Sequence, residues 1–154
     1  MMKDVYQIPE AELIAQARVD GIKAFCVGAG IVRDDKVLVV RRVPGFMGGQ
    51  CEIPGGGVEV GESFEEAIGR ETKEEAGLTV LAVIGMSEGF DYEEEQVKTR
   101  QFNFIVQVAA GDVALNLKEH DEYRWVGEEG LETLGLDEVM RNCLVSLFQN
   151  LKQL

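Results

Sequence analysis

Residues 56–78 read GGVEVGESFEEAIGRETKEEAGL, and this stretch decides how the rest of the chain is interpreted. Ser63 followed by Glu66 forms the capping box that begins a helix, so we expect a helix to start at Phe64. Gly77 is the residue type that commonly ends one. The stretch therefore predicts one helix between these two signals.

An apolar stripe on this helix continues into a row of carboxylates. The stripe consists of Phe64, Ala67 and Ile68. Seven residues further on, the same face carries Glu71, Glu74 and Glu75. Like charges at these spacings repel by a few tenths of a kcal/mol per pair, and inward-facing carboxylates need a cation or shifted pKa values. The pattern predicts a site for Mg²⁺ or Mn²⁺, which prefer oxygen ligands, with a solvated glutamate-rich helix as the alternative.

The spacing of these residues resembles the Nudix box of Nudix hydrolases, G-x5-E-x7-R-E-U-x-E-E-x-G-U, in which U is aliphatic. The pattern falls on Gly56, Glu62, Arg70, Glu71, Glu74, Glu75, Gly77 and Leu78. The one departure is Thr72, at the first aliphatic position. Thr72 lies on the buried side of the predicted helix, where a β-branched residue of similar size can substitute.

The order of predicted elements fits the fold of that family. Helices are predicted over 9–19, 64–76, 127–134 and 136–151, and strands over 22–32, 36–43, 51–53, 79–88, 99–109 and 122–126. Residues 90–96 read as an acidic loop. We expect one α+β domain over residues 1–154, and the resemblance implies an α/β/α sandwich whose mixed, curved sheet carries helices on both faces.

The resemblance also implies an activity and roles for residues of the motif. Water would attack a phosphorus of a nucleoside diphosphate linked to another group, with Mg²⁺ or Mn²⁺ bound. The implied metal ligands are Glu71, Glu74, Glu75 and the carbonyl of Gly55. Arg70 is implied to hold Glu71 in place. Structural roles are implied for Gly56, Glu62 and Gly77.

Members of this family differ in the general base, and three candidates remain open here. One is Glu71 itself. The loop LKEHD, residues 117–121, supplies the other two, Glu119 and His120. We expect Glu119 to be an additional metal ligand or the base. His120 lies in a polar loop and is expected to be solvated.

Four residues are predicted on the substrate side. Arg41 and Arg42 end a predicted strand, so alternation sends them to opposite faces and one of them can reach a phosphate. Phe46, in a glycine-rich loop, is a candidate to stack on a base, with ordinary packing as the alternative. Asn103 alternates with Phe102 and Phe104 and is a candidate to read a base edge.

The composition of the chain argues against several classes of binding partner. The net charge of −13 opposes binding to long nucleic acid or to an anionic membrane. No apolar run approaches the roughly 20 residues that span a bilayer, and the first residues lack the apolar stretch of a signal peptide. The three cysteines show no CxxC spacing and are expected to be reduced thiols in the cytoplasm. A homodimer is possible, because the first helix can cover its own sheet or cross to a second subunit.

A small nucleotide is therefore the expected substrate. Our first expectation is hydrolysis of a nucleoside or deoxynucleoside triphosphate to the monophosphate and pyrophosphate. Two alternatives stay open. One is a pyrophosphatase for ADP-ribose or another nucleotide-sugar, and the other is a nucleotide-binding regulatory module without turnover.

Overall fold

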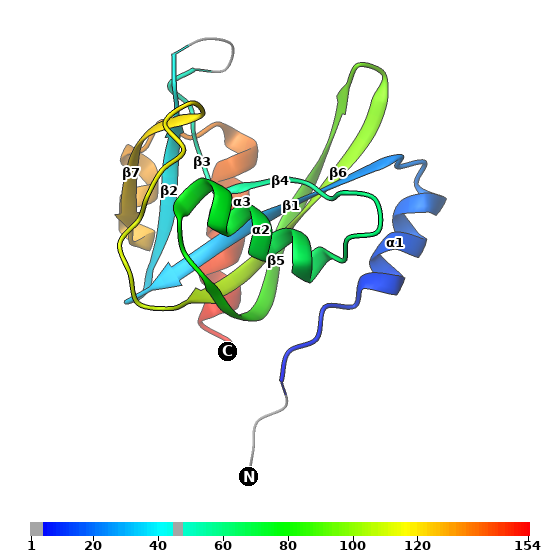
Figure 1. Ribbon diagram of the computed structural model, residues 1–154, viewed down its shortest axis with the longest axis horizontal. Helices are drawn as coiled ribbons and strands as arrows, with labels where there is room; N and C mark the ends of the chain where they lie inside the picture. The colour runs from blue at the N-terminus through cyan, green and yellow to red at the C-terminus, as the bar shows by residue number, and fades with distance from the viewer. Residues whose placement is uncertain (1–4, 45–47) are drawn as a thin grey trace.

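A mixed sheet of seven strands forms the centre of the computed structural model, which describes residues 5–44 and 48–154 (Figure 1). The strands are β1 (Ala24–Arg33), β2 (Lys36–Arg42), β3 (Cys51–Glu52), β4 (Gly55–Gly57), β5 (Val80–Glu94), β6 (Val97–Val108) and β7 (His120–Val126). Their order is β3-β2-β1-β6-β5, with β4 also paired to β1 and β7 to β2. Strands β1 and β6 run parallel, and the other pairs are antiparallel.

Helices cover both faces of this sheet. They are α1 (Glu10–Val19), α2 (Phe64–Ala76), the 3-10 helix η1 (Glu128–Thr133) and α3 (Glu138–Leu151). In Figure 1, α2 lies in front of the sheet and α3 behind it. Helix α2 packs on β1, β4 and β5, whereas α3 packs on β5 and β6. The expected α+β fold, a mixed sheet between helices, is confirmed.

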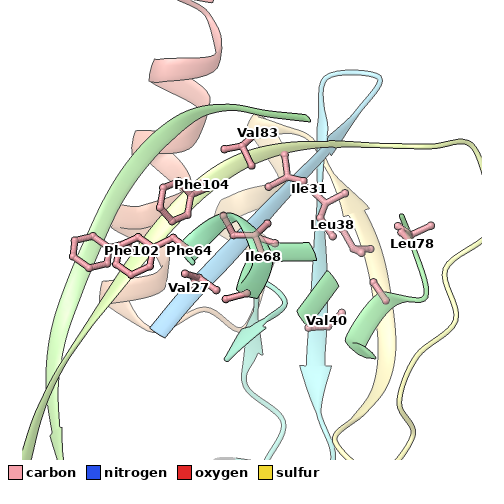
Figure 2. Close-up of a cluster of buried hydrophobic side chains, with 14 of the residues drawn as sticks. Val27, Ile31, Leu38, Val40, Phe64, Ile68, Leu78, Val83, Phe102 and Phe104 are labelled. Carbon is pink, nitrogen blue, oxygen red and sulfur yellow. The ribbon is translucent and has the colours of Figure 1, made fainter. Parts of the chain in front are cut away.

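Strand β2 shows why both faces of the sheet are buried. Leu38 and Val40 point into the core beneath α2, which also contains Phe64 and Ile68 (Figure 2). Val37 and Val39 alternate with them and join the second core, beneath α3. A strand buried on both faces reads as a continuous apolar run, which is the pattern of this segment. Each fully buried side chain of this size contributes roughly 1.5–3 kcal/mol, so the two cores hold the helices firmly on the sheet.

The predicted start and end of α2 are confirmed. The hydroxyl of Ser63 accepts a hydrogen bond from the amide of Glu66, and the Glu66 carboxylate accepts one from the amide of Ser63. Gly77 ends the helix with a φ of +70°. Glu10 of α1 adds a contact that the sequence does not reveal, because its carboxylate accepts a hydrogen bond from the amide of Phe64. This contact ties α1 to the start of α2.

The hairpin of β5 and β6 is longer than predicted. The expected acidic loop over 90–96 belongs to the two strands, apart from a tight turn at Glu95 and Gln96, whose φ angles are +51° and +68°. The guanidinium of Arg100 donates to both carboxylate oxygens of Asp91 on the facing strand, at 2.7 and 3.0 Å. Opposite charges across paired strands stabilise a sheet, and a search for apolar alternation misses such strands.

Two structural findings concern the cysteines and the possibility of a membrane-spanning helix. All three cysteines are free thiols, as expected. Within the described part of the chain, no helix combines the length and the apolar character needed to cross a membrane.

Candidate active site

One pocket brings together four residues of the motif, Gly56, Glu71, Glu74 and Glu75. It lies between the end of α2, strand β4, the end of β2 and the loop before β7, and its volume is about 520 Å³. Its lining includes five carboxylates, those of Glu52, Glu71, Glu74, Glu75 and Glu119. Two cations also line it, Arg42 and Lys118. Acidic groups outnumber basic ones, so this acidic pocket repels a phosphate unless a cation is added.

The three glutamates of α2 do not all face the same way. Glu71 and Glu75 are buried, with 8% and 7% of their surface exposed. Glu74 lies at the mouth of the pocket with 56% of its side chain exposed. The prediction that all three point inward is therefore wrong for Glu74. At 3.6 residues per turn, Glu71 and Glu75 lie near the middle of the buried face of α2, whereas Glu74 lies at its edge.

Arg70 is the centre of a hydrogen-bond network beside these glutamates. Its guanidinium donates to both carboxylate oxygens of Glu62, at 2.7 and 2.9 Å, and to the carbonyl of Gly57 at 2.8 Å. It also donates to Glu71 at 2.8 Å and to Glu74 at 3.3 Å. Hydrogen bonds from Arg70 lower the pKa of Glu62 to about 2, and those carboxylates raise the pKa of Arg70. The guanidinium fixes the orientation of the Glu71 carboxylate.

The two buried glutamates are costly to ionise. Burial raises the pKa of Glu75 to about 8, with further contributions from the charges of Glu71 and Glu119. The amide of Gly55 donates to Oε2 of Glu75 at 2.9 Å and acts in the opposite direction. Burial likewise raises the pKa of Glu71. Gly55 thus lies at the pocket as expected, but its contact with Glu75 uses the amide, and coordination through its carbonyl stays a prediction.

The two motif positions Gly56 and Gly77 require glycine for different physical reasons. A Cβ on Gly56 would come within 2.4 Å of Oε1 of Glu71. Gly77 adopts a positive φ, and a Cβ there would meet that of Ala114 at 2.8 Å. Gly56 therefore leaves room for the Glu71 carboxylate, whereas Gly77 lets the chain leave α2.

Glu119, in the loop before β7, and His120, the first residue of β7, both line the pocket. Glu119 is exposed, but His120 is buried with 2% of its surface exposed, and its Nε2 lies 2.9 Å from Oε2 of Glu52. The amides of Glu119 and His120 both donate to the carbonyl of Asn116 at 3.0 Å, which fixes the turn. The expectation that His120 is solvated is therefore wrong.

A β-bulge explains the burial of His120. The pairing of β2 with β7 shifts register between Arg41 and Arg42 and skips Asp121. Strict alternation from Val126, which packs beneath α3, would place His120 on that same side. The bulge turns His120 to the side of α2 instead, where it lines the acidic pocket.

The two arginines at the end of β2 point in different directions, as alternation predicts. Arg42 lines the acidic pocket and donates to Glu52 at 2.8 Å. Arg41 lies in a separate hollow and pairs with Asp121 at 3.0 Å and with Glu122 at 3.3 Å. Arg42 is therefore the arginine placed to reach a phosphate in the pocket.

The other two residues predicted to contact substrate are Phe46 and Asn103. Phe46 lies outside the described residues. Asn103 is fully buried on the face of the sheet that α3 covers, away from the acidic pocket. Its amide nitrogen donates to the carbonyl of Glu88 and its Oδ1 accepts from Gln101, both at 2.9 Å. The prediction that Asn103 reads a base is therefore wrong, because both polar atoms are satisfied within the fold.

Three pocket residues with polar side chains, Glu52, Asn116 and Lys118, were missed by sequence reasoning. For Glu52 the sequence contains a signal, because Glu52 precedes the apolar Ile53 in a predicted strand and must face the opposite side of the sheet. Ile53 packs beneath α3, so Glu52 faces the side of α2. Asn116 and Lys118 lie in an irregular loop, and no motif or periodicity places them near the glutamates of α2.

The donor set of the pocket fits a divalent cation. Burial raises the pKa of both Glu71 and Glu75, and a bound cation would offset the cost of ionising them. Carboxylate oxygens of Glu75 and Glu119 also lie within 4.8 Å of each other. Hard divalent cations prefer such oxygen ligands.

Known proteins resemble this chain in sequence and in fold. The sequence profile of the NUDIX domain matches residues 24–146. The nucleoside triphosphatase NudI of Enterobacter sp. (strain 638) is 36% identical over 107 residues, which cover 63% of this chain and 75% of the relative. The ADP-ribose pyrophosphatase of Methanocaldococcus jannaschii is 35% identical over 92 residues, or 58% of this chain and 54% of that relative. The solved structure of a MutT protein from Methanosarcina mazei Go1 matches with a TM-score of 0.71 at 27% identity, over 85% of this chain and 96% of that one.

The chain therefore belongs to the Nudix hydrolase family. It is an enzyme that acts on phosphoric anhydrides, and the class of its substrates is that of nucleotide derivatives. The family match covers the acidic pocket as well as the sheet, because the matched residues run from β1 into α3.

Proposed function

We propose that the enzyme hydrolyses a nucleoside triphosphate to the nucleoside monophosphate and pyrophosphate, with Mg²⁺ or Mn²⁺. One observation carries the proposal: the pocket brings the three motif glutamates of α2 together with an arginine that can bind a phosphate. Water adds its oxygen to the α-phosphorus, the anhydride bond to the β-phosphate breaks, and pyrophosphate leaves. The similarity to a nucleoside triphosphatase supports this choice of substrate.

Four groups of α2 and β4 are assigned to the cation: the carboxylates of Glu71, Glu74 and Glu75 and the carbonyl of Gly55. A bound divalent cation neutralises the diphosphate and makes its bound water acidic enough to attack phosphorus. Arg70 holds the carboxylate of Glu71 at 2.8 Å, so this ligand is oriented before the substrate arrives.

Glu119 is our candidate for the residue that takes the proton from the attacking water. Oε1 of Glu71 is already engaged by Arg70, and Nε2 of His120 lies against Glu52. Glu119 lines the same pocket, is exposed, and stands on a loop that its own backbone holds in place. An exposed carboxylate there can accept a proton and pass it to bulk water.

Arg42 and Lys118 are assigned to the phosphates that are not held by the cation. Both line the pocket, and they are the cations that offset its carboxylates. Arg42 supplies a planar donor group that suits a phosphate. The net charge of −13 disfavours a long nucleic acid as substrate and favours a small nucleotide.

A second candidate substrate is ADP-ribose or another nucleotide-sugar. It is favoured by the 35% identity to an ADP-ribose pyrophosphatase, although this chain spans about half the length of that relative. The two candidates differ in the group that leaves. A triphosphate gives pyrophosphate, whereas ADP-ribose gives AMP and ribose 5-phosphate.

The test is a panel of nucleoside triphosphates and nucleotide-sugars incubated with Mg²⁺, with products separated by ion-exchange chromatography. Glu74→Gln is compared with Glu65→Gln, which changes an exposed carboxylate on the same helix outside the acidic pocket. We expect Glu74→Gln to lose most of the turnover and Glu65→Gln to keep it. Equal turnover by the two variants would refute the metal assignment. Absence of turnover on every compound would favour a nucleotide-binding module.

A further inference from the structure

The acidic pocket contains a second set of possible ligands that the Nudix motif does not describe. A carboxylate oxygen of Glu75, a carboxylate oxygen of Glu119 and a ring nitrogen of His120 all lie within 4.8 Å of one another. Ligand atoms that share one ion at bond lengths of about 2.1 Å lie roughly 3–4 Å apart. A small side-chain adjustment therefore brings all three onto a single ion.

The hydrogen bonding of His120 leaves one ring nitrogen available. Its Nε2 lies 2.9 Å from Oε2 of Glu52, and Glu52 also accepts a hydrogen bond from Arg42. Glu52 is thus an acceptor, so the proton between the two residues belongs to Nε2. Nδ1 then carries a free lone pair. It is buried and has no hydrogen-bond partner among the described residues.

A buried nitrogen without a hydrogen-bond partner destabilises the folded protein, so its presence calls for a ligand. An imidazole that donates one N–H to a carboxylate and offers its other nitrogen to an ion is the usual arrangement of a metal-binding histidine. Glu52 and His120 supply the first half of this arrangement, and the unpartnered Nδ1 is available for the second. The bulge in β7 supplies the geometry, because it turns His120 toward the pocket rather than toward α3.

Glu119 is held beside His120 by the same backbone. The carbonyl of Glu119 accepts a hydrogen bond from the amide of Val43 at 2.9 Å, and the amides of Glu119 and His120 share the carbonyl of Asn116. The loop is therefore anchored at both ends.

We propose that Glu75, Glu119 and His120 form a metal position with mixed oxygen and nitrogen ligands, which binds Mn²⁺, Co²⁺ or Zn²⁺ in preference to Mg²⁺. This position deepens the proposed function, on which it rests through Glu75, a ligand that it shares with the motif. Glu119 binds the ion through one carboxylate oxygen and keeps the other to accept the proton of the attacking water. Imidazole nitrogen is a poor ligand for Mg²⁺ and a good one for later divalent metals. A site made of the motif oxygens alone carries no such preference.

The direct test is pulsed electron paramagnetic resonance on Mn²⁺ bound to tag-free protein without substrate. The chain has one histidine, so any imidazole coupling to the ion belongs to His120. We expect a nitrogen coupling in the wild type that changes when histidine alone is labelled with ¹⁵N. His120→Gln keeps a polar group facing Glu52 but lacks a nitrogen at the Nδ1 position, and we expect it to lose the coupling.

Calorimetric titration supplies an independent measurement. His120→Gln and Glu119→Gln are expected to weaken Mn²⁺ binding by about tenfold or more and to change Mg²⁺ binding by less than about threefold. Glu122→Gln is the matched control, because Glu122 lies on the same strand but outside the acidic pocket. It should leave both affinities unchanged.

The outcomes separate this inference from the proposed function. Mn²⁺ that binds and supports turnover without nitrogen coupling would overturn the inference and leave the hydrolase proposal intact. Coupling that persists in His120→Gln would overturn the assignment of the nitrogen. Equal weakening of Mn²⁺ and Mg²⁺ by His120→Gln would overturn the metal preference. Failure of the wild type to bind Mn²⁺ at all would overturn both proposals.

Discussion

The Cα of Gly56 lies so close to the carboxylate of Glu71 that a methyl group on it would come within 2.4 Å of Oε1 and 2.7 Å of Oε2. Strand β4 thus packs directly against the Glu71 carboxylate, and Arg70 orients the same carboxylate through a hydrogen bond. The Glu71 carboxylate can therefore occupy this position only if residue 56 has no side chain.

Gly56→Ala is expected to fold and to lower kcat by about a hundredfold, because it displaces the Glu71 carboxylate, and a displacement of about 1 Å can cost that much. Gly57→Ala is the control, since a Cβ on Gly57 meets nothing within 4 Å. The check is steady-state kinetics together with a thermal melt of both variants. Full activity in Gly56→Ala would show that the position of Glu71 is not required.

Thr72→Val is expected to stabilise the protein by about 1 kcal/mol, which raises Tm by roughly 2–4 °C. Thr72 is fully buried, and its hydroxyl has no hydrogen-bond partner among the described residues. Valine keeps the shape and removes the unsatisfied oxygen. Differential scanning calorimetry measures the change, with exposed Thr79→Val as the comparison. A lower Tm for Thr72→Val would mean that the hydroxyl has a partner in solution.

Arg42→Ala and Arg41→Ala should differ although the residues are neighbours. Arg42 lines the acidic pocket, so its loss should raise KM for a triphosphate by about tenfold, the value of one charge-assisted hydrogen bond. Arg41 pairs with Asp121 and Glu122 elsewhere, and its loss should change KM less than about twofold. Initial rates over a range of substrate concentrations decide the matter. The reverse order of effects would exchange the two assignments.

The metal-free protein should lose stability as the pH rises from about 5 to 8. The pKa of Glu75 is raised from 4.5 in the unfolded chain to about 8 in the folded one. The folded state therefore binds the proton of Glu75 more tightly than the unfolded chain does. The resulting contribution to stability is complete below the pKa of the unfolded chain and is lost as the pH rises through the pKa of the folded state. Added Mg²⁺ should reduce this decline by replacing the proton. Thermal melts across this range, with chelator or with Mg²⁺, test the effect.

Glu75→Gln isolates the contribution of this group to the pH dependence. Glutamine cannot ionise, so the metal-free variant should show a flatter profile than the wild type. An identical slope in both proteins would assign the pH dependence to other groups.

Local signals predict α2 well. Ser63, Glu66 and Gly77 mark its ends, and each acts through contacts within a few residues, so the sequence alone contains the information. The same is true of β2, where alternation separates Arg41 from Arg42. The family resemblance adds the grouping of the α2 glutamates into one site, since the spacing of the motif is itself a local signal.

Non-local geometry cannot be predicted in the same way. The sequence indicates a solvated His120 because the bulge that turns it inward depends on the pairing of β7 with β2, 80 residues away in sequence. It indicates a substrate contact for Asn103 because nothing in that residue's own strand shows that α3 covers the face. It indicates an inward Glu74 because the width of the buried stripe depends on what packs against it.

The continuous stripe on α2 has a consequence for engineering. Phe64 and Ile68 anchor the helix in the core, and turning it about its axis would expose both, at roughly 1.5–3 kcal/mol each. The carboxylates further along therefore cannot be re-aimed without opening the core. A library meant to change the nucleotide accepted by this enzyme should leave α2 untouched and randomise Val43, Pro44 and Asn116, which line the same pocket and belong to neither core.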